Sequence, residues 1–132
     1  MMGAFPISRK ENHAEKINVL LLEPNQKAKP VEIPDTLEAL QKVVGGYIEV
    51  MYPYEDMVGI VCNEEGKING LPLNRAIYSE DRQMLDVIAG PFLIVGLSGD
   101  DFASLPPDLM EKYRNQFLHP EGFIRTPSGG IM

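Results

Sequence analysis

Short apolar segments, each closed by Pro, Gly, Asn or charged residues, divide the chain into predicted strands and helices. Residues 17–23 are rich enough in aliphatic side chains for a buried strand, and Pro24 ends it. Residues 30–33 alternate between apolar and polar, which is typical of a half-exposed strand. The turn-forming residues 25–29 between the two segments predict that they pair as a hairpin.

A helix is predicted between Asp35 and the Gly45-Gly46 pair. Asp35 followed by Glu38 is a capping-box pattern, so we expect the Asp35 side chain to accept from first-turn N–H groups. Three apolar residues then fall on one helical face: Leu37, Leu40 and Val44. Because glycine readily adopts positive φ, the glycine pair predicts the end of the helix. A phosphate cradle would precede a helix instead of following it.

The middle of the chain predicts a second antiparallel pair, formed by residues 47–52 and 57–62. Polar residues then crowd into 63–75, where Gly and Pro favour turns and irregular structure. The segment 71–75 is too short for regular structure to be predicted, and it is interrupted by a proline. Residues 76–82 are polar enough to be surface.

The last third predicts two strands, a polar turn and a helix. Residues 84–88 and 92–95 are the strands, and the second is apolar on both faces, as in a central strand. Residues 98–101 are the turn. The helix begins near 104–108, where prolines are tolerated in a first turn. Its apolar face is made by Leu109, Met110, Tyr113 and Phe117.

The predicted order ββα, ββ, polar loop, ββ and α indicates an α+β fold. We expect a single domain at residues 16–118, with a largely antiparallel sheet of about five or six strands and two helices. Residues 1–15 and 119–132 lack periodicity and contain Gly, Pro and charged residues, so they are predicted to be a flexible arm and a flexible tail.

The charge balance limits the partners that the chain can take. The formal net charge is −7, which argues against a general binder of the phosphate backbone. Direct nucleic-acid binding is therefore not expected. An acidic mimic of DNA remains an alternative, although the Asp and Glu residues are scattered instead of forming long acidic runs.

Few residues could support catalysis or metal binding. A single cysteine, Cys62, excludes an internal disulfide, and its acidic neighbours Glu64 and Glu65 would raise a thiol pKa, so we expect it to be structural. His13 and His119 lie in the predicted terminal segments, outside any catalytic or zinc motif. We therefore expect no catalytic residues, no metal and no cofactor.

The apolar segments are far too short to span a bilayer, which requires about 20 residues. The N-terminal residues also lack an apolar core of signal-peptide length. We accordingly expect a cytoplasmic protein without membrane contact.

The polar stretch 63–75 holds the side chains that we predict to recognise a partner: Asn63, Glu64, Lys67, Asn69, Asn74 and Arg75. Amide groups both donate and accept, and a guanidinium offers a planar fork to carboxylate or phosphate. Two structural alternatives remain open. The asparagines could tie down their own backbone, and Arg75 could pair with Glu80 or Asp81.

Two other groups of side chains have both a functional and a structural reading. Three tyrosines near the second strand pair could form an exposed aromatic patch or pack in the hairpin: Tyr47, Tyr52 and Tyr54. The adjacent pairs Glu64-Glu65 and Asp100-Asp101 could hold a hard cation, but turn or cap chemistry is favoured.

Several segments together resemble a family of small domains of unknown function found in Firmicutes bacteria, their phages and conjugative elements. The resemblance runs from about Lys16 to Phe117 and is carried by 36–41, 44–49, 62–67, 70–75, 88–96 and 101–105. It implies an accessory protein of mobile DNA and transfers no catalytic residue.

Three hypotheses follow from the sequence. The leading one is a non-enzymatic accessory module of a mobile element or phage-derived region that contacts a protein partner through 63–75. An antiparallel sheet also leaves edges, so a homodimer through a sheet edge is plausible. The alternatives are a small-ligand or nucleotide-binding domain in which Lys67 and Arg75 hold an anion, and an acidic DNA-mimic or anti-defence protein. An enzyme is least favoured because no acid, base and nucleophile set is visible.

Overall fold

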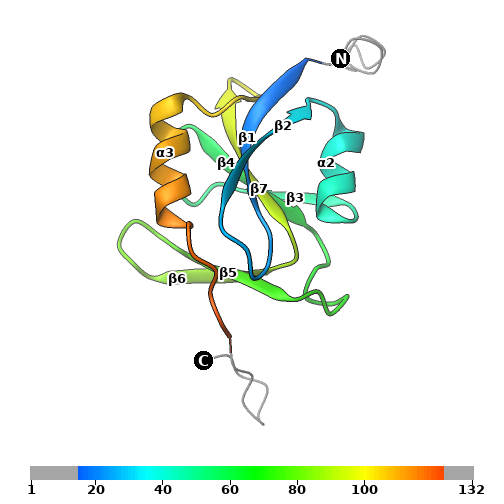
Figure 1. Cartoon of the computed structure of the whole chain (residues 1–132), viewed down its shortest axis with the longest axis vertical. Helices are drawn as coiled ribbons and strands as arrows, with labels where there is room; N and C mark the ends of the chain where they lie inside the picture. Colours follow the sequence, from blue (N-terminus) through cyan, green and yellow to red (C-terminus); the bar gives the residue numbers. More distant parts are fainter. Residues whose placement is uncertain (1–14, 124–132) are drawn as a thin grey trace.

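The computed structural model describes residues 15–123 (Figure 1). Apart from Glu15, the predicted arm lies outside the described residues, as does the predicted tail beyond residue 123. Within this range the elements follow the order β1 (Lys16–Leu22), β2 (Lys29–Pro34), α2 (Leu37–Val44), β3 (Ile48–Met51), β4 (Val58–Asn63), β5 (Leu73–Tyr78), β6 (Met84–Ala89), β7 (Phe92–Ser98), β8 (Asp101–Ala103) and α3 (Pro107–Gln116).

Six of the strands form one antiparallel sheet in the order β2-β1-β7-β4-β3, with β8 pairing to β7 beyond the end of β1. Strand β7 lies in the centre, as its apolar sequence predicts. Strands β5 and β6 form a separate two-stranded antiparallel sheet. The predicted α+β class, with a largely antiparallel sheet and two helices, is confirmed.

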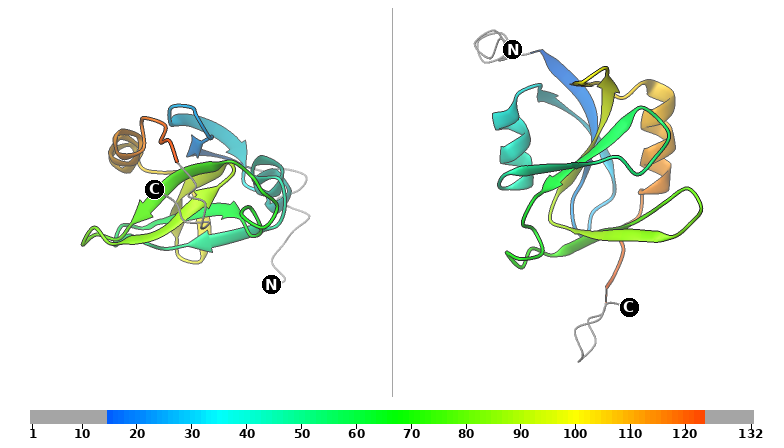
Figure 2. Two further views of the ribbon diagram at one scale, coloured as in Figure 1. Left: turned by 90° about the horizontal axis from the view of Figure 1, so that it is seen from below. Right: turned by 180° about the vertical axis from the view of Figure 1, so that it is seen from behind.

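The six-stranded sheet has a hydrophobic core on each face because its central strands are apolar on both sides. Helix α2 covers one face through Leu40 and Val44, which pack with Val61 and Val95. Helix α3 and the β5–β6 sheet cover the opposite face, and their side chains pack around Phe92. Figures 1 and 2 show the two helices on opposite sides of the molecule, with β5 and β6 crossing beneath the larger sheet.

Helix α2 begins one residue later than the capping-box pattern predicts. Thr36 is the N-cap, and its Oγ1 accepts from the Ala39 N–H at 3.1 Å. The Asp35 N–H donates to the Glu15 carbonyl at 2.8 Å, so Asp35 still continues the β1–β2 pairing and the helix starts after it. The predicted C-terminus is correct, because Gly45 has φ 83° and its N–H donates to the Gln41 carbonyl.

The prediction of irregular or surface structure across 71–82 is wrong for its central part. Strand β5 runs through it, and its residues 74–77 are buried. The sequence of this strand is polar although the strand is buried, because it contains Asn74 and Arg75, whose hydrogen bonds are described below. Residues 101–103, where the predicted polar turn ends, form the short strand β8.

Helix α3 agrees with its prediction. Pro106 is its N-cap and Pro107 its first residue, Tyr113 and Phe117 are buried, and Leu109 and Met110 pack against the same core. In the part of the chain that the structure describes, no helix is long and apolar enough to cross a membrane.

Candidate binding sites

The structure separates the six predicted recognition residues into two groups. Asn63, Asn74 and Arg75 are buried, and the last two are 0% exposed. The remaining three side chains, Glu64, Lys67 and Asn69, lie at the surface between β4 and β5. The six residues therefore do not form one contact surface.

Asn63 ends β4 and holds the C-terminus of α2. Its Nδ2 donates to the Val44 carbonyl at 3.1 Å, and its Oδ1 accepts from the Glu65 N–H at 2.7 Å. The first bond satisfies one of the carbonyls that a helix end leaves unpaired. The interpretation that asparagines tie down backbone is thus the one that the geometry of Asn63 supports.

Asn74 joins the two sheets. Its Nδ2 donates to the Leu22 carbonyl at 2.9 Å and to the Gly90 carbonyl at 2.8 Å. Its Oδ1 accepts from Arg75 Nη1 at 2.8 Å. Both ends of the amide are occupied, so Asn74 has no group left to offer a partner.

Arg75 is a buried cation that bonds carbonyl oxygens, not Glu80 or Asp81 as the sequence suggests. Its Nη2 donates to the Gln26 carbonyl at 2.7 Å and to the Phe117 carbonyl at 3.0 Å. Burial lowers the pKa of the guanidinium, and the negative charge of Glu121 opposes that shift. Arg75 therefore lies out of reach of an anionic ligand at the surface.

Lys67 is exposed in the β4–β5 connection and forms an ion pair with Asp86 on β6. The hollow beside it has a volume of about 240 Å³ and also contains Glu49, Glu64 and Glu65. Carboxylates thus outnumber the single lysine in this hollow, so it does not favour an anion. Within residues 15–123 no group of His, Cys, Asp and Glu side chains has the arrangement of a metal site.

Cys62 is buried, as expected for a structural cysteine. Burial raises the pKa of its thiol to about 12, and the negative charges of Glu49 and Asp86 contribute to the increase. The acidic neighbours that matter lie on β3 and β6, not at Glu64 and Glu65. A thiol with so high a pKa does not act as a nucleophile at neutral pH.

The two ends of the six-stranded sheet differ in how far they are protected. Strand β2 carries Pro30 and Pro34 together with the charged Lys29 and Glu32, features that discourage edge-to-edge pairing. Strand β3 has no proline, and Glu49 is its one charged residue. We call β3 with its flanking residues Tyr47 and Tyr52 the open edge.

Of the three candidate tyrosines, two lie at this open edge and one lies elsewhere. Tyr47 is 70% exposed and Tyr52 is 63% exposed. Tyr52 also lies over Gly59 of β4, which has no side chain to fill that space. Tyr54 instead packs against the ring of Tyr113 on α3, with the ring centroids 5.1 Å apart.

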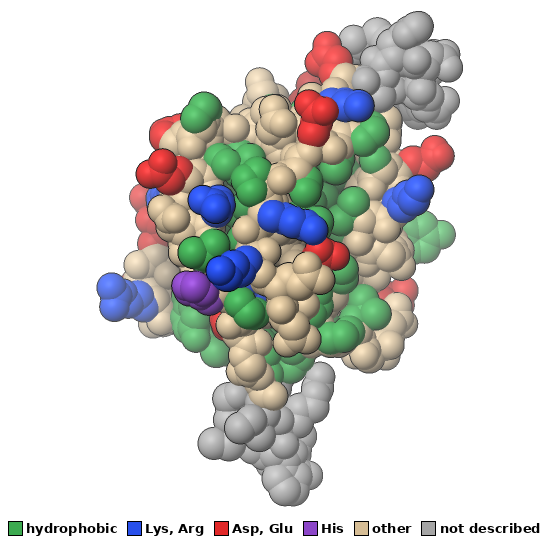
Figure 3. Space-filling view, in the orientation of Figure 1, with side chains coloured by type: hydrophobic (Ala, Val, Ile, Leu, Met, Phe, Trp, Pro, Cys, Tyr) green, Lys and Arg blue, Asp and Glu red, His purple; other side chains and the backbone are tan. Residues whose placement is uncertain are grey.

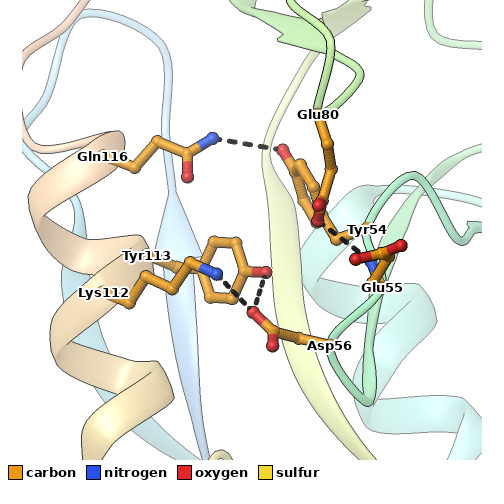
Figure 4. Close-up of polar contacts among 7 residues, drawn as sticks. All are labelled: Tyr54, Glu55, Asp56, Glu80, Lys112, Tyr113 and Gln116. Carbon is orange, nitrogen blue, oxygen red and sulfur yellow. Dashed lines mark hydrogen bonds and ion pairs between the residues drawn. The ribbon is translucent and has the colours of Figure 1, made fainter.

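A larger cleft lies between α3, the 54–56 turn and the end of the β5–β6 hairpin. We call it the tyrosine cleft; its volume is about 620 Å³ and it is lined by Tyr54, Tyr78, Ser79, Glu80, Arg82, Lys112, Tyr113 and Gln116. Figure 4 shows the polar contacts on its walls, with the side chains of α3 facing those of the turn.

Asp56 anchors α3 to the turn beside the cleft. Its carboxylate accepts from Lys112 Nζ at 2.6 Å and from the Tyr113 hydroxyl at 2.7 Å (Figure 4). The hydrogen bonds from Lys112 and Tyr113 lower the pKa of Asp56. Burial, followed by the Asp56 contact, raises the pKa of the Tyr113 hydroxyl. The Asp56 carboxylate thereby neutralises the positive charge of Lys112.

Two cleft residues on opposite walls are tied to neighbouring groups. Gln116 Nε2 donates to the Tyr54 hydroxyl at 3.4 Å, and Glu80 Oε1 accepts from the Glu55 N–H at 3.1 Å. Burial raises the pKa of Tyr54 to about 12, so its hydroxyl stays protonated at neutral pH. Sequence reasoning did not predict this cleft, because no local pattern connects residues 54–56 to a helix more than fifty positions away.

Comparison with known proteins identifies the family and no activity. The chain belongs to a family described as a domain of unknown function (DUF3846), whose family model matches residues 17–118. The resemblance to a domain family without assigned activity is thereby confirmed. No curated protein and no solved structure matches the chain.

Proposed function

We propose that this member of the DUF3846 family is a non-enzymatic binding module that pairs a strand of a protein partner with its open edge. The single observation that carries the proposal is the contrast between the two end strands. Strand β2 carries two prolines and two charged residues that hinder the pairing of a further strand. Strand β3 instead is a continuous β-forming segment flanked by two exposed tyrosines. Partner strands add to edges of this kind through main-chain hydrogen bonds.

Along β3, alternate residues direct their backbone N–H and C=O groups toward β4 and toward the open side. The residues of the second kind are those that a partner strand would pair with. The Tyr47 carbonyl accepts from the Glu64 N–H, which marks these two residues as a hydrogen-bonded pair of the β3–β4 ladder. In an antiparallel ladder the next inward pair is two residues on, at Glu49 and Cys62. Ile48 and Val50 then direct their N–H and C=O groups toward the open side.

Charge favours a basic partner strand over a second copy of the chain. Glu49 is the one charged side chain of β3, and the chain carries a formal charge of −7. Two copies would bring like charges together, and the register centred on Glu49 would set the two carboxylates opposite each other. A partner segment with Lys or Arg opposite Glu49 would instead gain an ion pair.

The wider setting that we propose is an accessory factor of a phage or another mobile element of Firmicutes bacteria, working in the cytoplasm. The support for this setting is the sequence resemblance together with the single free cysteine, Cys62. An acidic DNA mimic is a weaker alternative. Figure 3 shows several Lys and Arg side chains near the middle of one face and most acidic side chains toward its rim, and this face lacks the long acidic surface that a mimic needs.

The proposal is tested by capturing partners from a host that carries the gene and mapping the contact by hydrogen exchange. The compared proteins are wild type, Glu49→Lys and Glu111→Lys. Both variants change the charge equally, but Glu111 lies exposed on α3, away from the open edge. We expect wild type and Glu111→Lys to retain a partner that Glu49→Lys loses. The bound partner should also slow amide exchange at Ile48 and Val50.

Two outcomes would count against this assignment. A partner retained equally by all three proteins, with no added protection in β3, would place the contact on another surface. Sedimentation as a dimer, with amide exchange slowed at Ile48 and Val50 in the protein alone, would replace the foreign partner by a second copy of the chain.

A further inference from the structure

We propose that the tyrosine cleft binds a small ligand made of a planar ring and an oxyanion group, either a carboxylate or a phosphate. This site is independent of the open edge, because its lining residues lie on α3, the 54–56 turn and the end of the β5–β6 hairpin. A cleft of about 620 Å³ falls within the range of small-molecule sites in proteins.

Aromatic side chains supply the walls on which a planar ring would lie. The half-buried Tyr54 packs on the fully buried ring of Tyr113, with the two rings inclined at 37°, and this contact fixes the Tyr54 ring relative to α3. Tyr78 enters from the opposite side and keeps 43% of its surface exposed at the end of β5. Aromatic rings of this kind offer large contact areas with little conformational entropy to lose.

Arg82 is the cation available to the anionic end of the ligand. Among residues 15–123 its guanidinium has no hydrogen-bond or ion-pair partner. The residue is held at φ 66° in the hairpin end, where its N–H donates to the Ser79 carbonyl at 2.9 Å. A guanidinium on such a turn can offer two parallel N–H donors to a carboxylate or phosphate.

Tyr54 and Gln116 supply orienting groups between the ring walls and Arg82. The Tyr54 hydroxyl accepts from Gln116, and its own proton has no acceptor within the described residues. Because its pKa is about 12, that proton is available for donation at neutral pH. The Gln116 Oε1 atom is likewise left to accept from a ring nitrogen or hydroxyl of the ligand.

The cleft is close to neutral although the whole chain is acidic. Arg82 and Lys112 line the cleft against one lining carboxylate, Glu80. Lys112 is paired with Asp56, so the charges left on the cleft walls are those of Arg82 and Glu80. Glu80 accepts from the Glu55 N–H, and among residues 15–123 the Arg82 guanidinium makes no hydrogen bond or ion pair to it. The pair first predicted to hold an anion, Lys67 and Arg75, is bound instead to Asp86 and to buried carbonyls.

The test is a set of NMR titrations with four probes. Adenosine monophosphate and 4-hydroxybenzoate each combine a ring with an oxyanion, and they distinguish a phosphate-bearing from a carboxylate-bearing ligand. Adenosine carries the ring alone, and inorganic phosphate carries the anion alone. We expect at least one combined probe to bind saturably, to bind more tightly than either part, and to shift the side-chain amide of Gln116.

Arg82→Gln is the diagnostic variant, and Arg114→Gln is its matched control. Both remove one exposed guanidinium, but Arg114 does not line the cleft. We expect Arg82→Gln to weaken the combined probe about tenfold or more, as for loss of a charged hydrogen bond, and Arg114→Gln to leave it unchanged. Equal binding to both variants, or no saturable shift at Gln116 with any probe, would overturn the proposal. Neither result depends on the partner test for the open edge.

Discussion

The guanidinium of Arg75 donates to the carbonyl oxygen of Phe117 from both Nε (3.3 Å) and Nη2 (3.0 Å). Phe117 is the C-cap of α3, and Arg75 lies in β5, so this contact ties the smaller sheet to the end of the last helix. A cation at this position also faces the negative end of the helix dipole. The side chain is thus a structural link between two elements that share no backbone pairing.

Arg75→Met should therefore destabilise the fold strongly. The variant leaves two buried acceptors, the Phe117 carbonyl and Asn74 Oδ1, without their donor, and we expect the free energy of unfolding to fall by about 3 kcal/mol or more. Urea denaturation followed by circular dichroism measures the loss. Lys67→Met is the control, because an exposed ion pair contributes about 1 kcal/mol or less. Equal stability of the two variants would contradict a structural role for Arg75.

The contact between Asp56 and α3 predicts a loss of stability in acid. The hydrogen bonds from Lys112 and Tyr113 lower the pKa of Asp56 in the folded chain. A lowered pKa contributes stability above the unfolded value, near 3.8, and that contribution disappears as the pH falls through the folded value. Wild type should therefore exceed Asp56→Asn in melting temperature at neutral pH, and the difference should shrink in strong acid.

Thermal melts at several pH values check this prediction, with Asp100→Asn as the control. Asp100 lies in an exposed turn and loses the same charge without a defined contact to α3. A difference between wild type and Asp56→Asn that stays constant from neutral pH to strong acid would mean that the charge on Asp56 does not stabilise the fold.

Elements with a strong local pattern could be predicted from the sequence, and those stabilised by distant partners could not. The hairpin of β1 and β2, the glycine that ends α2 and the apolar face of α3 all follow from spacing within one segment. Strand β5 was missed because Asn74 and Arg75 find their acceptors 52 and 42 positions away, at Leu22 and Phe117. From the sequence alone a polar residue is predicted to be exposed, because the distant buried group to which it bonds is not known.

The same limit applies to the candidate sites. The tyrosine cleft depends on contacts such as Asp56 with Tyr113, which are 57 residues apart. The open edge also required the strand order, because the sequence predicts that β3 is a strand without predicting that it ends the sheet. From the sequence, Tyr47, Tyr52 and Tyr54 could form an exposed patch or pack in the hairpin. In the structure Tyr47 and Tyr52 are exposed and flank this edge, whereas Tyr54 packs against Tyr113.

Cys62 should resist alkylation in the folded protein. Burial, reinforced by the charges of Glu49 and Asp86, raises the pKa of its thiol to about 12, so almost no thiolate exists at pH 8. We expect iodoacetamide to modify Cys62 slowly in buffer and rapidly in concentrated urea, as followed by mass spectrometry. Because the folded pKa lies above the unfolded value of 9.0, the protonated thiol contributes stability below pH 9 that is lost toward pH 12. Equally fast modification in both solvents would show an accessible thiolate.

Gly96 should be one of the least replaceable residues of the central strand. A Cβ atom on this residue would lie 2.3 Å from the carbonyl oxygen of Ser104 and 2.9 Å from its carbonyl carbon. The obstructing atoms are backbone and cannot rotate away. They are also held in place, since Gly96 pairs with Ala103 and the Leu105 N–H donates to the Asn18 carbonyl at 2.8 Å. Added volume at Gly96 must therefore separate β7 from the segment that leads into α3.

Gly96→Ala is accordingly expected to lower the free energy of unfolding by about 3 kcal/mol, at the upper end of what overpacking costs. Gly122→Ala is the matched control, because no atom lies within 4 Å of the Cβ position at Gly122 and its φ is not positive. That variant should stay within about 0.5 kcal/mol of wild type in urea denaturation. Similar stabilities for both variants would mean that the Ser104 backbone does not cross Gly96 at contact distance.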